Sequence, residues 1–68
     1  MKLRDLRKRN GLTQSALASK VGVTRVTIAR IEAGTRIPSP DFVKKVMKEF
    51  GLSIVEAWRM FYGEENEK

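Results

Sequence analysis

The 68-residue chain contains no cysteine and no histidine. Disulfide bridges, zinc sites with thiolate or imidazole ligands, and nucleophilic catalysis by Ser-His or Cys-His pairs are therefore unavailable to it. No apolar run approaches the roughly 20 residues that a membrane-spanning helix needs. The basic start, MKLRDLRKRN, leads into no apolar segment, so we expect no signal peptide. We predict a cytoplasmic protein that is not an enzyme and has no cofactor or metal.

Charge is the most informative feature of the composition. The chain carries 14 Lys and Arg against 8 Asp and Glu, a net charge of +6. Residues 1–62 hold 13 of the basic and 5 of the acidic side chains, whereas GEENEK at 63–68 holds one and three. We therefore predict one small domain at 1–62 and a short acidic flexible tail at 63–68. A basic domain favours a polyanionic partner, usually nucleic acid, although a solvated charged surface has the same composition.

Five helical segments are predicted, each with its own start and stop residues. Thr13, Thr24 and Ser39 can cap the second, third and fourth segments, and SIVE at 53–56 is a capping box for the fifth. A glycine follows each of the first four segments, as is common at helix ends. No strand pattern or internal repeat competes, so the predicted fold class is all-α. The expected ranges are about 2–10, 14–21, 25–33, 40–50 and 54–62.

The connection between the second and third segments is very short. Only Gly22 and Val23, with Thr24 as the cap, separate the two helices, so they must cross sharply rather than lie antiparallel. The alanine-rich second segment permits close packing at the crossing. This pattern predicts a helix-turn-helix, whose second helix can present its outer face to a DNA major groove.

Four short motifs follow one another between Leu3 and Ser53. They are GLTQ before a Leu-Ala pair, VGVT at the turn, IARIEAG through the third segment, and Pro-Ser ahead of the fourth. With these motifs, about three quarters of the chain resembles the XRE or Cro/repressor family of helix-turn-helix DNA-binding domains. The resemblance implies a five-helix, phage-repressor-like fold that usually dimerises and binds short palindromic operators in double-stranded DNA.

The outer face of the third segment carries an apolar strip between two arginines. Arginine can donate two hydrogen bonds to guanine, and Val or Ala can contact a thymine methyl group. An ordinary solvated face is the alternative, but valine is a mediocre helix former and the helix dipole disfavours a cation in the first turn. Where the family commonly carries glutamines this chain has Arg25, Val26 and Arg30, which favours guanine over adenine. The predicted base-reading residues are Arg25, Val26, Ala29 and Arg30.

A second group of residues is predicted to contact DNA phosphates and so to set the register without reading sequence. The family glutamine that matches Gln14 binds backbone phosphate and braces the recognition helix, and free amides at a helix start suit an anion in any case. A neutral surface amide is the alternative for Gln14. The remaining members supply hydroxyl groups, a loop cation and free backbone amides. The group comprises Gln14, Thr24, Thr27, Gly34, Thr35, Arg36 and Ser39.

Arg7 lies on the inward side of the first segment, four residues after Leu3. An unpaired charge in that position is unfavourable. Glu32 is the acid best placed to meet it, and the family has an Arg–Glu pair at the matching positions. The alternative is that the side chain of Arg7 extends along the surface to water. We predict a structural ion pair between Arg7 and Glu32.

The last segment has more apolar surface than one core contact requires. A stripe at helical spacing runs from Ile54 to Phe61, and further apolar side chains broaden it. These side chains can close the core of so small a domain, or they can meet a partner. We predict a homodimer interface formed by Val55, Trp58 and Tyr62, because a twofold dimer places two recognition helices roughly 34 Å apart, about one DNA turn.

Together these features predict a sequence-specific DNA-binding transcriptional regulator, a dimeric repressor of phage or mobile-element type that binds a palindromic operator. A DNA-binding antitoxin and a restriction-modification controller are alternatives within the same class. A protein-interaction module on the same fold is an alternative of another class, in which the last helix and the acidic tail bind a regulatory protein. Preference for one duplex over scrambled DNA at physiological salt separates the two classes.

Overall fold

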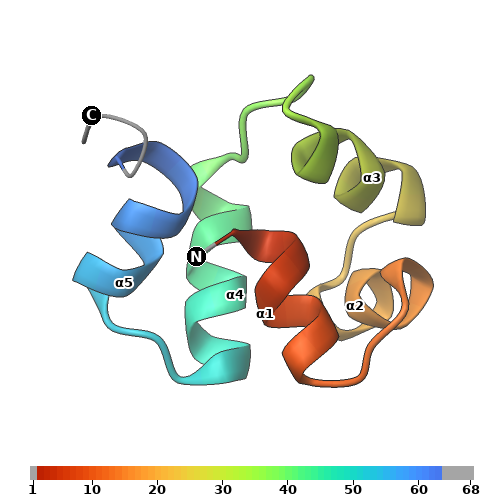
Figure 1. Cartoon of the computed structure of the whole chain (residues 1–68), viewed down its shortest axis with the longest axis horizontal. Coiled ribbons are helices and arrows are strands. Elements are labelled where there is room, and N and C mark those ends of the chain that lie inside the picture. Colours follow the sequence, from red (N-terminus) through yellow and green to blue (C-terminus); the bar gives the residue numbers. More distant parts are fainter. Residues whose placement is uncertain (1, 64–68) are drawn as a thin grey trace.

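The computed structural model describes residues 2–63, in which the regular elements are helices and no strand occurs. In Figure 1, α4 runs through the middle of the view, with α5 on one side of it and the α2–α3 pair on the other. The predicted all-α, five-helix fold is confirmed, whereas residues 64–68 of the predicted acidic tail lie outside the described residues. The elements are α1 (Leu3–Arg9), α2 (Gln14–Val21), α3 (Arg25–Ala33), α4 (Pro40–Phe50), α5 (Ile54–Trp58) and a π-helical turn, η1 (Arg59–Gly63).

Local capping interactions explain where the helices begin and end. The side-chain hydroxyls of Thr13, Thr24, Ser39 and Ser53 each accept a hydrogen bond, 3.0–3.2 Å long, from the backbone amide three residues further on. These bonds satisfy amides that have no partner inside the helix. Gly22 ends α2 with φ of 73°, a left-handed conformation that glycine adopts without steric penalty. The chain can therefore leave α2 and enter α3 within a few residues.

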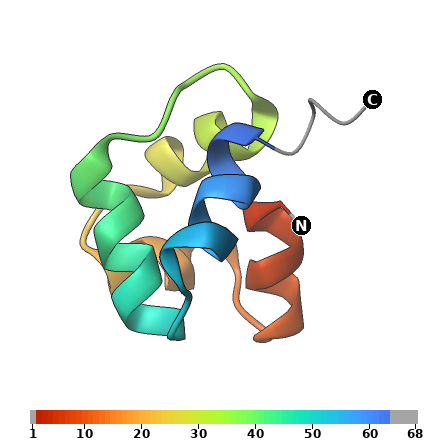
Figure 2. The same cartoon turned by 90° about the vertical axis from the view of Figure 1, so that its left-hand side faces the viewer.

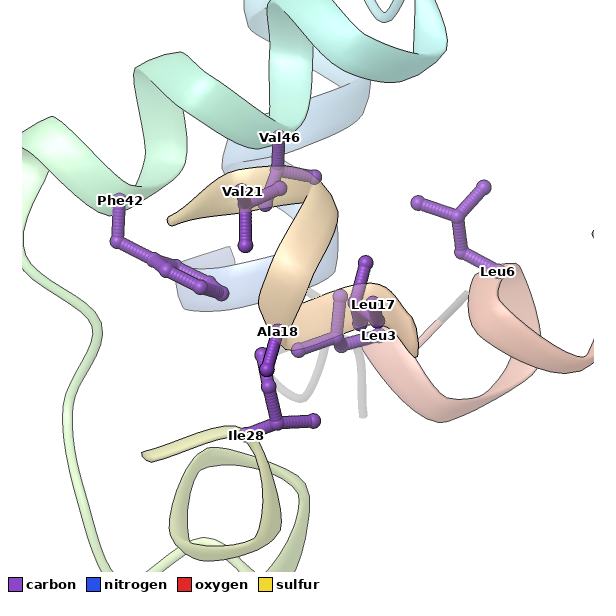
Figure 3. Close-up of a cluster of buried hydrophobic side chains, with 8 residues drawn as sticks. All are labelled: Leu3, Leu6, Leu17, Ala18, Val21, Ile28, Phe42 and Val46. Carbon is purple, nitrogen blue, oxygen red and sulfur yellow. The ribbon is translucent and has the colours of Figure 1, made fainter. Parts of the chain in front are cut away.

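The hydrophobic core is built around α2, as Figure 3 shows. The side chains of Leu17, Ile28 and Val46, from α2, α3 and α4, are completely buried. Burying a side chain of this size stabilises the fold by about 1.5–3 kcal/mol. Ile28 is the one side chain of α3 that is fully buried, so most of this helix remains available at the surface. The core cluster comprises Leu3, Leu6, Leu17, Ala18, Val21, Ile28, Phe42 and Val46.

The fifth helix differs from the prediction in its second half. The predicted helix over about 54–62 is α-helical only to Trp58 and then widens into η1. In this turn the ring of Phe61 lies edge-on to Phe42, with centroids 5.9 Å apart. The hydroxyl of Tyr62 donates a 3.2 Å hydrogen bond to the carbonyl of Pro38. These contacts with distant residues accompany the wider turn, and the local sequence does not predict them.

Figure 2 faces α5 and shows the segment between α3 and α4 arching over the top of the molecule. This segment brings Pro38, which is buried, close to the end of η1. Within residues 2–63, no helix has both the length and the apolar character required to cross a membrane.

Candidate nucleic-acid interface

The two helices of the helix-turn-helix pack directly on each other. The amide of Val23 donates a 2.9 Å hydrogen bond to the carbonyl of Ala18, which closes the turn between α2 and α3. Ala18 is buried, and its small side chain allows the backbones to approach closely. Ile28 faces this contact, so the opposite face of α3 is directed to solvent. Figure 1 shows α3 along the outer edge of the molecule, next to α2.

The outer face of α3 carries the four side chains predicted to read bases. Arg25 and Arg30 are exposed, and Val26 is 45% exposed although it is a large apolar residue. Ala29 is only partly exposed. The structure therefore brings two cationic side chains and an exposed valine together on one helix surface, with Ala29 beside them.

Arg7 and Glu32 are hydrogen-bonded across the α1–α3 contact. Nε of Arg7 donates to Oε2 of Glu32 at 2.7 Å, and Nη2 donates to Oε1 at 3.1 Å. The third nitrogen, Nη1, donates to the carbonyl of Leu12 at 2.9 Å. The two side chains are only 11% and 6% exposed. The two bonds to Glu32 tie α1 to the end of α3, and the bond to Leu12 ties α1 to the residues just before α2.

The environment of the pair shifts both ionisation equilibria. Burial on its own raises the pKa of Glu32, but hydrogen bonds from Arg7 and Gln14 outweigh it, and the pKa lies below its ordinary value. The hydrogen bond to Glu32 raises the pKa of Arg7 above its ordinary value. Each group therefore favours the charged form of the other.

Gln14 lies between this ion pair and the outer face of α3. Its Nε2 donates to Oε1 of Glu32 at 3.1 Å, and its Oε1 accepts a 3.3 Å hydrogen bond from Nη1 of Arg25. The resemblance implied that Gln14 braces the recognition helix, but the sequence did not identify Glu32 and Arg25 as its partners. The one available signal was that Gln14 and Arg25 are the first residues of two consecutive helices, which a short turn joins.

The remaining residues predicted to contact phosphates fall in two places. Thr24 and Thr27 lie at the start of α3, where their hydroxyl oxygens are 3.0 Å apart. Thr35 donates from its hydroxyl to the carbonyl of Arg30 at 3.2 Å, just after the helix ends. Ser39 caps α4 and retains its own hydroxyl hydrogen as a donor. Gly34 and Arg36 are exposed in the same segment, so the two groups of residues flank α3 at its two ends.

Large apolar side chains make up most of the exposed surface of α5, on which Glu56 is also exposed. Ile54 is 71% exposed, and Val55 and Trp58 are each 59% exposed, whereas Ala57 is buried against the core. The ring of Tyr62 is half-buried and lies 4.7 Å from that of Trp58. Of the three residues predicted at a dimer interface, Val55 and Trp58 are therefore open to solvent, and Tyr62 supports Trp58 from within the same chain.

A family model described as helix-turn-helix matches residues 3–56. The chain therefore belongs to the helix-turn-helix family, and the family membership predicted from the motifs is confirmed. The domain is thus of the class found in transcriptional regulators, as the names of its relatives show.

Three relatives illustrate the range of similarity. An uncharacterised HTH-type transcriptional regulator of Bacillus subtilis, YgzD, is 39% identical over 84% of this chain and 86% of its own. An uncharacterised HTH-type transcriptional regulator of Methanocaldococcus jannaschii, MJ0272, is 45% identical over 78% of this chain and 80% of its own. The cryptic phage CTXphi transcriptional repressor RstR of Vibrio cholerae is 38% identical over 81% of this chain and 50% of its own. No solved structure matches the chain.

Proposed function

We propose that this protein is a sequence-specific DNA-binding transcriptional regulator that places α3 in the major groove. The observation that carries the proposal is the exposure of Arg25 and Arg30 on α3, whose one fully buried side chain is Ile28. A rigid helix that presents two guanidinium groups to solvent suits the guanine edge, which offers two adjacent acceptors in the major groove. The names of the relatives, which describe transcriptional regulators, agree with this role. The proposed activity is binding without catalysis.

In this proposal the four outer residues of α3 contact bases in two ways, by hydrogen bonds and by apolar contacts. Arg25 and Arg30 donate hydrogen bonds to guanine O6 and N7. Val26, with nearly half of its surface exposed, contacts a thymine methyl group. Ala29 is less exposed and supplies a shallower apolar contact beside Val26. The expected half-site therefore contains guanine and thymine as close neighbours.

Phosphate contacts at both ends of α3 hold it in register. Thr24 and Thr27 lie where α3 begins, and Gln14 bonds to Arg25 at that end and to Glu32 near the other. Gly34 and the segment after it lie where α3 ends. Because the phosphates line both sides of the major groove, contacts at the two ends of the helix fix its depth and direction. Thr35, Arg36 and Ser39 complete this second group.

We further propose that the regulator acts as a homodimeric repressor of the phage type. The apolar surface of Val55 and Trp58, extended by Tyr62, supports self-association, since Val55 and Trp58 are each 59% exposed and the ring of Tyr62 packs beside that of Trp58. A twofold dimer reads a palindrome with two α3 helices roughly 34 Å apart. The similarity to a protein named as a phage repressor supports repression as the outcome.

Selection of bound duplexes from a random DNA pool at physiological salt tests the proposal. We expect an enriched palindrome whose half-site centres are about 10 base pairs apart. The matched control is the Arg25→Ala, Arg30→Ala variant, which keeps the fold and should enrich no sequence. If the wild-type chain enriches none, the proposal is wrong, and a protein-interaction module that uses the α5 face becomes the better explanation.

A further inference from the structure

A groove of about 660 Å³ lies where the beginning of α1, the end of α3, the segment between α3 and α4, and η1 meet. Figure 2 shows these four parts in the same region of the molecule. Ligand sites in proteins commonly have volumes of about 300–1,000 Å³ and mostly apolar walls with a few polar groups. The size of the groove is therefore that of a site for a small organic molecule.

Four apolar side chains form the floor of the groove. Leu3 lines it and is almost completely buried, at 4% exposed. Ile31, Met60 and Phe61 also line it; they pack against the core on one side and remain partly exposed. Because an apolar ligand removes such surface from water, this floor favours a ligand with an apolar chain.

Three cationic side chains also line the groove. They are Lys2, Arg4 and Arg36, which are exposed and make no hydrogen bond or ion pair within residues 2–63. Among the described residues, the one acid in the lining is Glu32, which Arg7 already pairs at 2.7 Å. The groove therefore offers an excess of positive charge, and a concave surface with apolar walls concentrates the field of that charge.

Contacts between distant residues hold the walls of the groove in place. The hydroxyl of Tyr62 donates a 3.2 Å hydrogen bond to the carbonyl of Pro38, which ties η1 to the segment between α3 and α4. The ring of Phe61 lies edge-on to that of Phe42 on α4. The groove is therefore formed before a ligand binds, which reduces the entropy lost on binding.

We propose that this groove binds an organic anion with an apolar chain, of the chemical class of a medium-chain carboxylate. The apolar chain covers the floor, and the carboxylate lies among the cationic side chains, where a guanidinium group can donate two hydrogen bonds to it. A polyanion such as DNA has no apolar chain to cover the floor, and a neutral hydrocarbon leaves the cations without a partner. The floor and the cations together therefore define the ligand class.

A ligand in the groove affects the proposed function through Arg36. This side chain lines the groove and is also one of the proposed phosphate contacts. A carboxylate bound to Arg36 competes with a DNA phosphate, so the ligand acts as an inducer that releases DNA. This regulatory step rests on the proposed function, whereas binding of the ligand does not.

Methionine methyl groups give a local readout of ligand binding to the full chain. Met60 lines the groove, whereas Met47 on α4 does not. In NMR spectra of the chain labelled at its methionine methyl groups, decanoate should shift the Met60 signal saturably and leave the Met47 signal unchanged. Equal shifts of both signals would indicate non-specific association and overturn the site.

Two further probes separate the parts of the ligand. Decanol lacks the charge and acetate lacks the chain, so each should bind roughly tenfold more weakly than decanoate. Equal binding of decanol would show that the cations play no part, and equal binding of acetate that the floor plays none. Either result overturns the proposal.

Arg4→Glu reverses one charge in the groove without changing a residue that we assign to DNA. The position is exposed in the first turn of α1, where an acidic side chain suits the helix dipole, so the variant should fold. We expect the affinity for decanoate to fall roughly tenfold. Lys8→Glu makes the same change in net charge at an exposed position of α1 outside the groove, and is the matched control.

The control should bind decanoate within about twofold of wild type, because solvent screens a charge outside the groove. Equal losses in Arg4→Glu and Lys8→Glu would reduce the effect to net charge and overturn the site. Circular dichroism establishes that both variants are folded. The comparison of decanoate with decanol uses the wild-type chain, so it decides the question even if Arg4→Glu does not fold.

The acidic end of the chain is the competing occupant of the groove. Glu64, Glu65 and Glu67 follow Tyr62 closely in the sequence, and Tyr62 lines the groove. The full-length variant Glu64→Gln, Glu65→Gln, Glu67→Gln should bind decanoate at least as tightly as wild type. If decanoate binds to this variant and not to wild type, the chain's own acidic end is the occupant and the proposal is wrong.

The regulatory step is tested separately with the selected duplex. Saturating decanoate should weaken DNA binding by the wild-type chain roughly fivefold at physiological salt, the loss expected for one phosphate contact. In Arg36→Ala, which already lacks that contact, decanoate should change the DNA affinity by less than about twofold. If decanoate binds and the wild-type DNA affinity is unchanged, the inducer role is overturned while the ligand site stands. If the chain prefers no duplex, the proposed function is wrong, and the ligand measurements decide the site independently.

Discussion

The third and fifth helices are built alike on the inside and differently on the outside. Each turns a completely or almost completely buried apolar side chain to the core, Ile28 from α3 and Ala57 from α5. The outer face of α3 carries Arg25 and Arg30, whereas that of α5 carries large apolar side chains, Trp58 among them. One small domain therefore presents two surfaces of different chemistry.

This difference shows what each surface is suited to bind. Guanidinium groups on a protruding helix suit a polyanion, because water-exposed cations lose little on approaching phosphates and bases. Of the five large apolar side chains that are markedly exposed in the described residues, three lie on α5, so its outer face suits a protein surface. These two chemistries are the basis of the proposals that the outer face of α3 binds DNA and that the outer face of α5 binds a second copy of the chain.

We expect the largest effect on stability when the ion pair that links α3 to α1 is broken. Glu32→Leu leaves the guanidinium of Arg7 without its acceptor in a site that is 11% exposed. We expect a loss of about 3 kcal/mol in the free energy of unfolding, measured with urea. The free energy of unfolding should fall less in the Arg7→Met, Glu32→Leu variant than in Glu32→Leu alone. A loss in the double variant equal to the sum of the losses in Arg7→Met and Glu32→Leu would show that the two residues are not coupled.

A charge introduced on the outer face of α5 tests whether the exposed apolar side chains of this helix form a dimer interface. Val55→Asp puts a carboxylate into the proposed interface, and we expect dimerisation to weaken by about 2 kcal/mol. The monomer should remain folded, since an acidic side chain suits the first turn of a helix. Light scattering at tens of micromolar measures the change. Ile37→Ser, at an exposed apolar position outside α5, is the control and should not alter the mass.

Arg25→Ala sharpens the assignment of the outer face of α3. We expect a loss of about 1–3 kcal/mol in binding to the selected duplex and a relaxed preference at a single base position. Competition binding with duplexes altered one position at a time measures both effects. A uniform loss across all duplexes would instead make Arg25 a phosphate contact.

The pH dependence of the free energy of unfolding tests the ion pair in the unmutated protein. The pKa of Glu32 is lower in the folded chain than its ordinary value, since hydrogen bonds from Arg7 and Gln14 outweigh its burial. Its contribution is therefore complete above its unfolded-state pKa, about 4.3, and is lost as the pH falls through the folded-state pKa. Urea unfolding between neutral pH and acid should show this loss in wild type. The Arg7→Met, Glu32→Leu variant should lose correspondingly less stability.

The smallest expected effect concerns the segment after α3. Arg36→Ala removes one proposed phosphate contact, so the slope of log binding constant against log salt should fall by about 0.9. Base preference should remain as in wild type. Lys44→Ala, on an exposed position of α4, is the matched loss of charge. An unchanged slope in Arg36→Ala would argue against the contact.

Much of the fold could be predicted from the sequence because the signals are local. The bounds of α2 and α3 coincide with the predicted ranges, since Thr13, Thr24 and the glycines after each helix define them within a few residues. The interior side of α3 was also accessible, because helical periodicity alone places Ile28 opposite Val26. The same rule placed Arg25 and Arg30 at the surface of α3.

The end of α5 could not be predicted in this way. The continuous apolar pattern from 54 to 62 favoured one α-helix, but contacts of Phe61 with Phe42 and of Tyr62 with Pro38 accompany a π-helical turn there. Periodicity also placed Ile54 and Ala57 on one stripe, yet the first is 71% exposed and the second is buried. Which part of a stripe becomes buried depends on how far neighbouring elements extend over it.

The sequence by itself determined most of the helix bounds, the short turn, and which side of α3 is buried, because each depends on residues a few positions apart. Only the tertiary structure decided that Gln14 lies between Glu32 and Arg25. These residues are separated by 18 and 11 positions, and their meeting depends on how α1, α2 and α3 cross. The physical reason is that a hydrogen bond needs its atoms within about 3 Å, a condition that helix packing sets and local pattern does not.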